Sequence, residues 1–147
     1  MKKLLHIFQL SCLPSSVDVG LLVLRVWLGL AMSLLHGKGK LLGFAEMSQK
    51  FLDPFGIGPS ASLALAVFAE LVCGALLALG FVTRFAALNL VITMGVAFFI
   101  AHKGSLAQGP GSGEMAFIYL AGFVTLLISG GGRFSLDAML QKGAPRS

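Results

Sequence analysis

Four long apolar blocks dominate this sequence and restrict the folds open to it. They cover residues 19–35, 61–79, 85–101 and 114–129. Their lengths are close to the roughly 17–25 helical residues that span a bilayer core of about 30 Å. None of them has a polar face at helical period, and none alternates like a barrel strand. Because only helices and closed barrels satisfy backbone groups in lipid, the sequence predicts an all-α integral membrane four-helix bundle, with four transmembrane helices.

The composition agrees with a membrane protein and excludes one class of partner. Hydrophobic residues make up 56% of the chain and charged residues 12%, whereas soluble domains carry about 25% charged residues. The formal net charge is +5. The basic residues are spread thinly and form neither a stripe nor a nucleic-acid motif, so no nucleic-acid partner is predicted.

The distribution of Lys and Arg predicts the topology of the chain. In a four-pass protein, the loops and termini of the two sides receive unequal shares of these residues. One side carries Lys2, Lys3, Arg84, Arg133, Lys142 and Arg146, and the other carries Lys38, Lys40, Lys50 and Lys103. Excess Lys and Arg marks the cytoplasmic side of a bilayer, so both termini are predicted to be cytoplasmic.

The blocks divide the chain into three predicted parts. Residues 1–16 form an N-terminal interfacial segment, residues 17–140 form the four-helix membrane domain, and residues 141–147 form a C-terminal tail. Two lysines before an apolar run also resemble the start of a signal peptide, so cleavage of the first part is the alternative. After the glycines that end the fourth block, Ser135 is expected to cap a short helix on the inner surface.

The loop over residues 36–60 is long and contains several aromatic residues. Phe44, Met47, Phe51 and Phe55 recur at near-helical spacing, which predicts an amphipathic helix on the outer interface. This helix would serve either as a lid over a pocket or as an anchor in the interface. The sequence leaves both interpretations open.

Two charges lie inside the apolar blocks. Arg25 shares a helical face with His36, three turns further along. Glu70 lies on a stripe of small residues, which lets a neighbouring helix approach closely. A charge at the bilayer centre costs about 2.5–3.5 kcal/mol, so we expect Arg25 and Glu70 to form an ion pair. The pair would either fix the register of two helices or serve a polar ligand or a proton relay.

Smaller polar residues predict the inward faces of the other two helices. Asn89 and Thr93 share a face of the third block, and a stripe from Glu114 to Ser129 marks the fourth. His102 lies nearly opposite Asn89 on a regular helix. It could join the inward face only if the third helix bends or unwinds.

Ionisable side chains also gather at the outer ends of the predicted helices. They are His36, Lys38, Lys40, His102, Lys103 and Glu114. A quinone-like or anionic head group suits this set, because histidine donates hydrogen bonds or takes up a proton near neutral pH. A metal ion suits it less well. Cys12 and Cys73 form no Cys-x-x-Cys pair, and no metal site is predicted.

Several stretches together resemble the DoxX family of small four-helix bacterial membrane proteins. They are "LRVWLGLAMSLLHGKGKLLGF", "FAELVCGALLALGFVTRFAALNL", "HKG" and "GEMAFIYLAGFVTLLISGGGRFSLD", in that order. The resemblance covers roughly residues 17–140 and implies a multi-pass protein of the bacterial inner membrane that is tied to redox chemistry. Related subunits act with thiosulfate:quinone oxidoreductases. Carried over by motif, the candidate site residues are Arg25, His36, Lys40, Glu70, Arg84, His102 and Glu114.

Two functions are compatible with these features. The first is a quinone-linked, redox-associated membrane subunit with a polar site inside the bundle, and at most a subunit of an oxidoreductase. Quinone is then the candidate cofactor, and electrons would come from a soluble or membrane partner enzyme. The alternative is a non-catalytic scaffold or small-lipid-binding protein that anchors a soluble enzyme. The bilayer is the common partner, and the sequence leaves homo-oligomers open.

Overall fold

The computed structural model describes residues 8, 16–107, 109 and 111–143, and within them every regular element is a helix. The all-α prediction is therefore confirmed. The predicted interfacial segment, apart from Phe8 and Ser16, lies outside the described residues, as do Cys12 and the end of the tail.

Three of the four apolar blocks form helices that contain a π-helical turn, written η, which lies between α-helical stretches in the first two and ends the third. The first span consists of α2 (Val17–Ala31), η1 (Met32–Gly37) and α3 (Lys38–Leu42). The second consists of α5 (Pro59–Val67), η2 (Phe68–Cys73) and α6 (Gly74–Leu79). The third consists of α7 (Thr83–Gly95) and η3 (Val96–Ala101), and the fourth is α8 (Glu114–Ser129). Two short helices complete the described chain, α4 (Phe44–Met47) and α9 (Leu136–Gly143).

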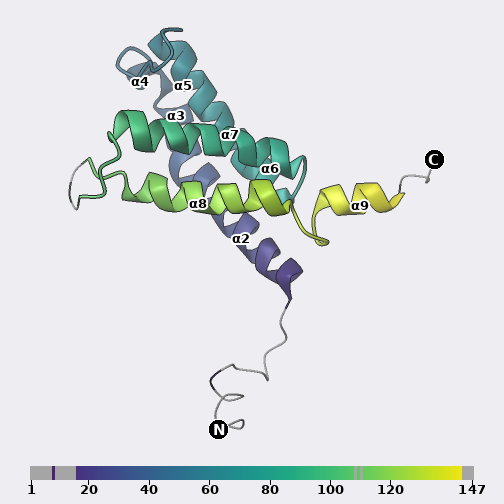
Figure 1. The fold of residues 1–147 in the computed structure, drawn as a ribbon. Coiled ribbons are helices and arrows are strands. Elements are labelled where there is room, and N and C mark those ends of the chain that lie inside the picture. The colour runs from purple at the N-terminus through teal and green to yellow at the C-terminus, as the bar shows by residue number, and fades with distance from the viewer. Residues whose placement is uncertain (1–7, 9–15, 108, 110, 144–147) are drawn as a thin grey trace.

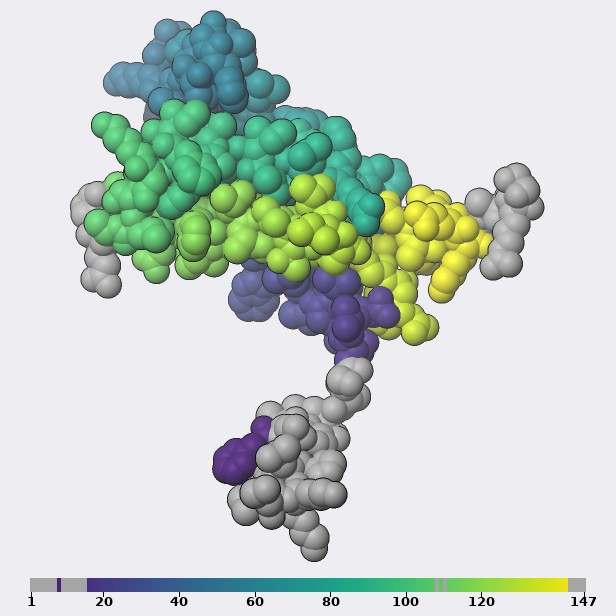
Figure 2. Space-filling view, in the orientation of Figure 1, coloured from purple at the N-terminus to yellow at the C-terminus, as the bar shows by residue number. Residues whose placement is uncertain are grey.

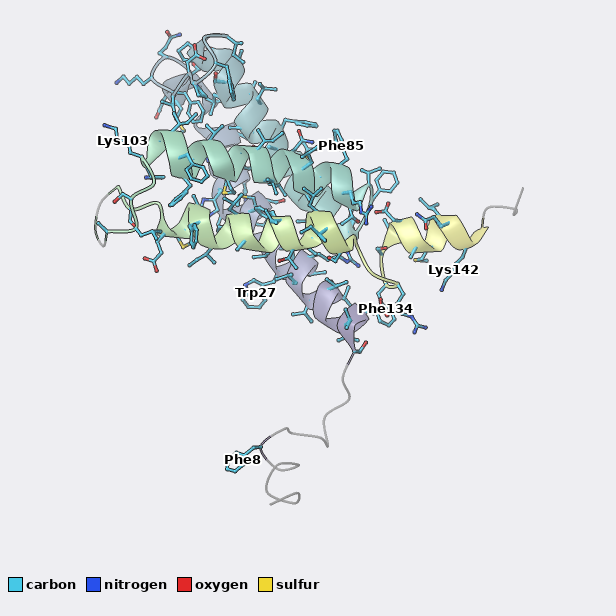
Figure 3. The ribbon with its side chains drawn as sticks, viewed as in Figure 1. Phe8, Trp27, Phe85, Lys103, Phe134 and Lys142 are labelled. Carbon is cyan, nitrogen blue, oxygen red and sulfur yellow. The ribbon has the colours of Figure 1, made fainter. Side chains whose placement is uncertain are left out.

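The lengths and surfaces of these helices suit a bilayer. Val17–Leu42, Pro59–Leu79 and Thr83–Ala101 are long and apolar enough to cross a membrane, and the apolar helix Glu114–Ser129 is shorter, with 16 residues. Large apolar side chains lie on the outside, among them Trp27, which is 75% exposed and projects from α2 in Figure 3. In water such a surface would be unfavourable, whereas in lipid it is expected. The predicted helical membrane bundle is confirmed.

Each of the four spans packs against two of the others, so together they form a closed bundle. Helix α2 packs against α6, and α7 packs against both α6 and α8; α8 also touches α2 (Figure 1). Small residues allow the close contact between the first two spans: a Cβ on Gly29 would lie 2.5 Å from the carbonyl oxygen of Gly74. Leu77, Leu90 and Phe123 fill the centre and have no exposed surface.

The predicted inward faces hold for the first two spans and fail for the fourth. Arg25 and Glu70 are 2% and 3% exposed, as their stripes predict. On α8, however, Ala116, Tyr119 and Phe123 are buried, whereas the stripe from Glu114 to Ser129 faces outward. The prediction that this stripe faces inward was wrong. The hydroxyls of Thr125 and Ser129 donate to carbonyls one turn back on the same helix, so these side chains can face lipid.

The ends of the spans form two separate regions. The start of α2, the turn between α6 and α7, and the segment after α8 meet at one end, which we call the inner end after the predicted topology. Helices α3 and α4 and the loop after η3 lie at the other, the outer end (Figure 1). Helix α9 extends away from the bundle at the inner end and stands out beside it in Figure 2. Its predicted cap is confirmed, because Ser135 Oγ accepts from the Ala138 N–H at 3.2 Å.

Candidate functional site

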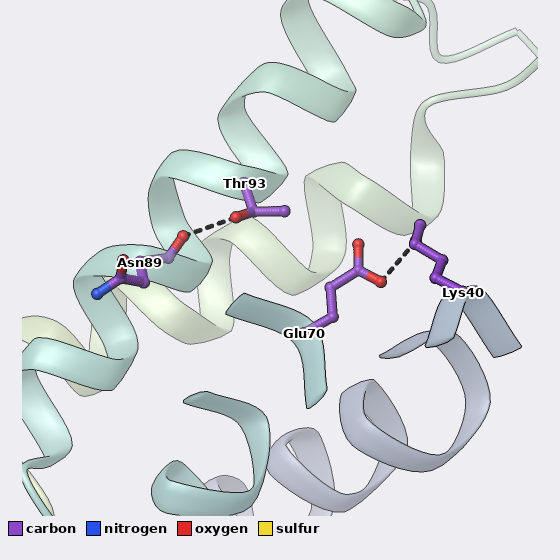
Figure 4. A network of polar contacts seen from close by, with 4 residues as sticks. All are labelled: Lys40, Glu70, Asn89 and Thr93. Atoms are coloured by element: carbon purple, nitrogen blue, oxygen red, sulfur yellow. Dashed lines mark hydrogen bonds and ion pairs between the residues drawn. The ribbon is translucent and has the colours of Figure 1, made fainter. Parts of the chain in front are cut away.

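The predicted ion pair between Arg25 and Glu70 is wrong. Glu70 instead pairs with Lys40, with 2.5 Å between Lys40 Nζ and Glu70 Oε2 (Figure 4). The sequence predicts that the first helix ends at Leu35 and that Lys40 lies in a loop. The helix in fact continues through η1 into α3 and ends at Leu42, which brings Lys40 to the level of Glu70.

In the Lys40–Glu70 pair, Glu70 is buried and Lys40 is partly exposed. The Glu70 side chain is 4% exposed and the Lys40 side chain 23%. An ionised carboxylate in such a place is stable only with a partner, because desolvation costs several kcal/mol per ion. The Lys40 ammonium supplies that partner. The lysine has three N–H donors, one of which is used by Glu70, so others remain for a ligand.

A cavity of about 410 Å³ lies beside this pair. Its volume falls within the roughly 300–1,000 Å³ that small-molecule sites occupy, and most of its wall is apolar. The wall combines α5, η2, α7 and η3 with the first loop. The polar or ionisable residues that line it are Lys40, Ser62, Glu70, Asn89, Thr93 and His102.

Asn89 and Thr93 line the cavity from α7; Thr93 points toward Glu70, whereas the Asn89 side chain points away from the pair (Figure 4). The Asn89 amide nitrogen donates to the Phe85 carbonyl at 2.9 Å, and the Thr93 hydroxyl donates to the Asn89 carbonyl at 2.9 Å. These donors are used within their own helix, which leaves the Asn89 side-chain oxygen as an acceptor. The cavity thus has a donor side at Lys40 and an acceptor side at Asn89.

The π-helical turns bring residues from three spans to the cavity. Each turn contains one extra residue, so it rotates the positions that follow, and such turns are frequent at functional sites. The η3 turn supplies the unwinding that His102 needs, and His102 lines the same cavity as Asn89. His102 Nδ1 donates to the Gly111 carbonyl at 2.9 Å, because a carbonyl can only accept. In the neutral ring, Nε2 is then an acceptor.

The first loop forms part of the cavity wall, but not as the predicted helix. Of the helix predicted from Phe44 to Phe55, only α4 is helical, and Phe51, Leu52 and Phe55 line the cavity from irregular backbone. A turn at Asp53 holds this stretch: its carboxylate accepts from the N–H groups of Ile57 and Gly58 and from the Ser62 hydroxyl, at 2.8–3.1 Å. This placement favours the interpretation of the loop as a lid.

The Asp53 carboxylate is held in its charged form. Desolvation would raise its pKa, but the hydrogen bonds from Gly58, Ser62, Ile57 and Gly56 outweigh it, so the pKa lies below its ordinary value. The loop therefore keeps this turn at neutral pH.

The remaining candidate residues lie away from the cavity. The His36 ring packs edge-on against Tyr119, with 5.6 Å between the ring centroids. Glu114 is exposed in the first turn of α8, where the helix dipole favours a carboxylate. Arg84 is exposed and donates to the Ile128 carbonyl at 3.1 Å. The cavity therefore brings together three of the seven candidates, Lys40, Glu70 and His102.

Arg25 belongs to a separate network at the inner end. Its guanidinium donates to the Ala78 carbonyl at the end of α6 and to the Phe134 carbonyl at 2.7 Å. Asp137 on α9 accepts from Val82 N–H at 2.7 Å, and from Thr83 N–H and hydroxyl at 2.8 and 2.7 Å. The motif "GGGRFSLD" thus ties the C-terminal segment to three spans, and Arg25 takes part in these contacts.

The Asp137 carboxylate also has a lowered pKa. Burial would raise the pKa, but the hydrogen bonds from Thr83 and Val82 and the charge of Arg25 outweigh it, so the pKa lies below its ordinary value of 3.8. A lowered folded-state pKa stabilises the fold above the unfolded-state pKa, and this contribution is lost as the pH falls through the folded value.

We expect Asp137→Asn to lower the free energy of unfolding by about 1 kcal/mol at neutral pH, since the residue caps α7 through its side chain. The difference in stability between wild type and variant should shrink as the pH falls below 3.8. Thermal unfolding in detergent at several pH values measures this difference. A difference that stays constant with pH would contradict the assignment of the charge.

Among the described residues, no group of three His, Cys, Asp or Glu side chains comes together as metal ligands would. Cys73 is a free, fully buried thiol on η2. The site has the character of a pocket for a largely apolar molecule that carries one polar end.

Comparisons with known proteins find similar bacterial membrane proteins. A family model described as DoxX matches residues 20–103. The inner membrane protein YqjF of Escherichia coli is 31% identical over 129 residues, which cover 85% of this chain and 95% of that protein. The uncharacterized membrane protein Rv3486 of Mycobacterium tuberculosis is 33% identical over 126 residues, 71% of this chain and 77% of its own. An uncharacterized protein of Haemophilus influenzae is 34% identical over 104 residues, 69% of either chain. No solved structure matches at a comparable level.

Proposed function

We propose a function for this chain on the basis of its family: the chain belongs to the DoxX family. It is a multi-pass protein of the bacterial inner membrane. We infer that it is a quinone-linked, redox-associated membrane subunit, and that the cavity beside Lys40 and Glu70 receives the quinone head group.

The proposal rests on the position of the Lys40–Glu70 ion pair at the wall of a cavity that is otherwise mostly apolar. A quinone has two carbonyl oxygens that accept hydrogen bonds, on a ring that is otherwise apolar. Lys40 and, when protonated, His102 are the donors of the cavity, whereas Leu65, Ile92 and Phe51 supply apolar wall. The donor set therefore fits the group, and the wall fits its ring and tail.

The charged residues of the cavity also suit proton handling. When bound, a quinone accepts two electrons and two protons, and the electrons would come from a partner enzyme. Glu70 and His102 are the side chains of the cavity whose chemistry allows them to give or accept a proton. Lys40 would orient the head group through its remaining N–H donors.

A small-lipid-binding scaffold is the second candidate. Leu65 and Ile92 line the cavity and are 56% and 52% exposed, so its apolar wall continues onto the surface that faces acyl chains. An acyl chain could enter there without any redox chemistry. This candidate predicts binding of fatty acids in place of quinones.

A fluorescent reporter inside the cavity tests the proposal. Trp27 is the sole tryptophan of the sequence and faces lipid, so it reports only quinone dissolved in the membrane. We therefore combine Trp27→Phe with Phe51→Trp and titrate decylubiquinone or a menaquinone analogue into nanodiscs. The expected result is saturable quenching at position 51, against a linear response at Trp27 in the wild type.

Lys40→Met in the reporter background is expected to raise the Kd by about 10- to 100-fold, because a hydrogen bond from a charged donor contributes roughly 1.5–3 kcal/mol. The matched control is Lys38→Met, an exposed lysine two positions earlier that does not line the cavity. The double variant Lys40→Met/Glu70→Leu removes both charges, so lost binding in a stable protein excludes misfolding as the cause. Quenching that stays linear at position 51, or saturation by oleate alone, would reject the quinone and favour the scaffold.

A further inference from the structure

A second hollow of about 650 Å³ lies at the inner end of the bundle, apart from the quinone cavity. We call it the inner-end groove. It lies between the first turn of α7, the end of α8, the glycine segment that follows, and α9. The residues that matter for its chemistry are Arg84, Phe85, Ser129, Arg133, Asp137 and Gln141.

Two arginines give the groove its charge. Arg84 and Arg133 both line it and are both exposed. The Arg133 guanidinium lies 5.6 Å from the centre of the Phe134 ring, which holds it over that ring. Arginine presents a planar fork of donors that matches a phosphate group in two-point contacts.

The acidic residue in the groove does not cancel this charge. Both Asp137 carboxylate oxygens accept hydrogen bonds from Val82 and Thr83, and the charge of Asp137 acts on the buried Arg25. The negative charge of Asp137 is therefore balanced by the buried Arg25. The charge that remains for a ligand in the groove is that of Arg84 and Arg133.

The two ends of the bundle differ in their charge balance. Of the described residues at the inner end, Arg25, Arg84, Arg133 and Lys142 are basic, and Asp18 and Asp137 are acidic. At the outer end, Lys38, Lys40, Lys50 and Lys103 are matched by Glu46, Asp53, Glu70 and Glu114. The described inner end is therefore net positive and the described outer end is neutral. The net charge of the described residues therefore favours an anion at the inner end over the outer end.

The groove also lies at the border between polar and lipid-facing surface. Phe85 on its rim is 54% exposed, and Ile128 beside Arg84 is 72% exposed. On α9, Met139 and Leu140 are 64% and 61% exposed, and Lys142 extends from the same helix (Figure 3). Apolar and basic side chains thus lie next to one another at this end of the bundle, as they do at the depth of the lipid head groups.

We propose that the inner-end groove binds the phosphodiester head group of an anionic glycerophospholipid, with Arg84 and Arg133 as its phosphate ligands. The acyl chains run down the apolar outer surface of α7 and α8 from Phe85 and Ile128. Basic pockets between transmembrane helices on the cytoplasmic side suit such head groups, because that leaflet surface carries negative charge. The bound lipid joins α9 to the bundle at the network that Arg25 and Asp137 form.

Native mass spectrometry of the whole protein, released from nanodiscs, tests this assignment. The probes are cardiolipin and phosphatidylglycerol against phosphatidylcholine. Wild type is expected to retain the two anionic lipids and not the zwitterionic one. Arg84→Gln/Arg133→Gln should weaken retention by about 30-fold, since each basic residue near a membrane surface contributes about 5-fold.

Matched variants separate the groove from general charge. Lys50→Gln/Lys103→Gln removes two exposed cations from the outer end and should leave retention unchanged. Arg133→Gln alone keeps the Arg84 contact to α8, so it tests the groove even if the double variant folds poorly. Equal loss in the outer-end control overturns the site. Competition by inorganic phosphate alone as strong as that by lipid overturns the lipid as the ligand.

Discussion

Arg25→Met is expected to lower the free energy of unfolding by about 3–5 kcal/mol, the loss that follows when one member of a buried charge network is removed. Arg25 is 2% exposed and donates to carbonyls of two different segments, Ala78 at the end of α6 and Phe134 after α8. Without the guanidinium these carbonyls lose their donors, and Asp137 loses its nearby positive charge. The last turn of α6 and the C-terminal segment should both loosen.

Unfolding by sodium dodecyl sulfate, followed by far-ultraviolet circular dichroism, measures this loss. Arg25→Lys keeps the charge but carries no planar fork to span two carbonyls, so an intermediate loss is expected. Lys103→Met removes an exposed cation at the outer end and should change stability by less than about 0.5 kcal/mol. If Arg25→Met is no less stable than Lys103→Met, the inner-end network does not hold the bundle together.

The sequence predicts the bundle well because hydropathy is a local property. Four apolar blocks, the stripe of small residues around Glu70 and the inward direction of Arg25 and Glu70 are all visible without knowing any neighbour. The cap at Ser135 is equally local. These features depend on helical period and on the unfavourable transfer of charge into lipid, which apply before packing is known.

The partners of the charged residues could not be predicted in the same way. The cluster "HGKGK" resembles the start of an outer loop, so the sequence predicts too early an end for the first helix. Lys40 is then predicted to lie in the loop, apart from Glu70. The helix continues because its glycines allow the second span to approach, and because Glu70 stabilises a lysine at that position. Both causes depend on contacts with the second span, so a local pattern does not contain them.

The π-helical turns were missed for the same reason. No residue type marks them in the sequence, yet η3 is what brings His102 to the face of Asn89. The need for an unwound segment could be stated from the sequence, but its position could not. The cavity therefore contains Lys40, Glu70 and His102 together with apolar loop residues that carry no chemical signature of their own.

The close contact between the first two spans leads to the second large effect, which is expected at Gly37. A Cβ there would lie 2.5 Å from Leu71 N and 2.8 Å from the Glu70 carbonyl carbon, so it would meet backbone that cannot move aside. We expect Gly37→Ala to destabilise the protein at the upper end of the roughly 1–3 kcal/mol that overpacked cores lose. The separation of η1 from η2 should also disturb the Lys40–Glu70 pair and weaken quinone-analogue binding.

Gly39→Ala is the matched control for this change. Gly39 lies two positions later in the same span, and nothing lies within 4 Å of its Cβ position. Alanine favours a helix over glycine by up to about 1 kcal/mol, so this variant should be neutral or more stable. Denaturation of both variants in the same detergent gives the comparison. If the two substitutions have equal effects, the first two spans are not packed backbone to backbone beside Glu70, and the cavity loses the support that this contact gives it.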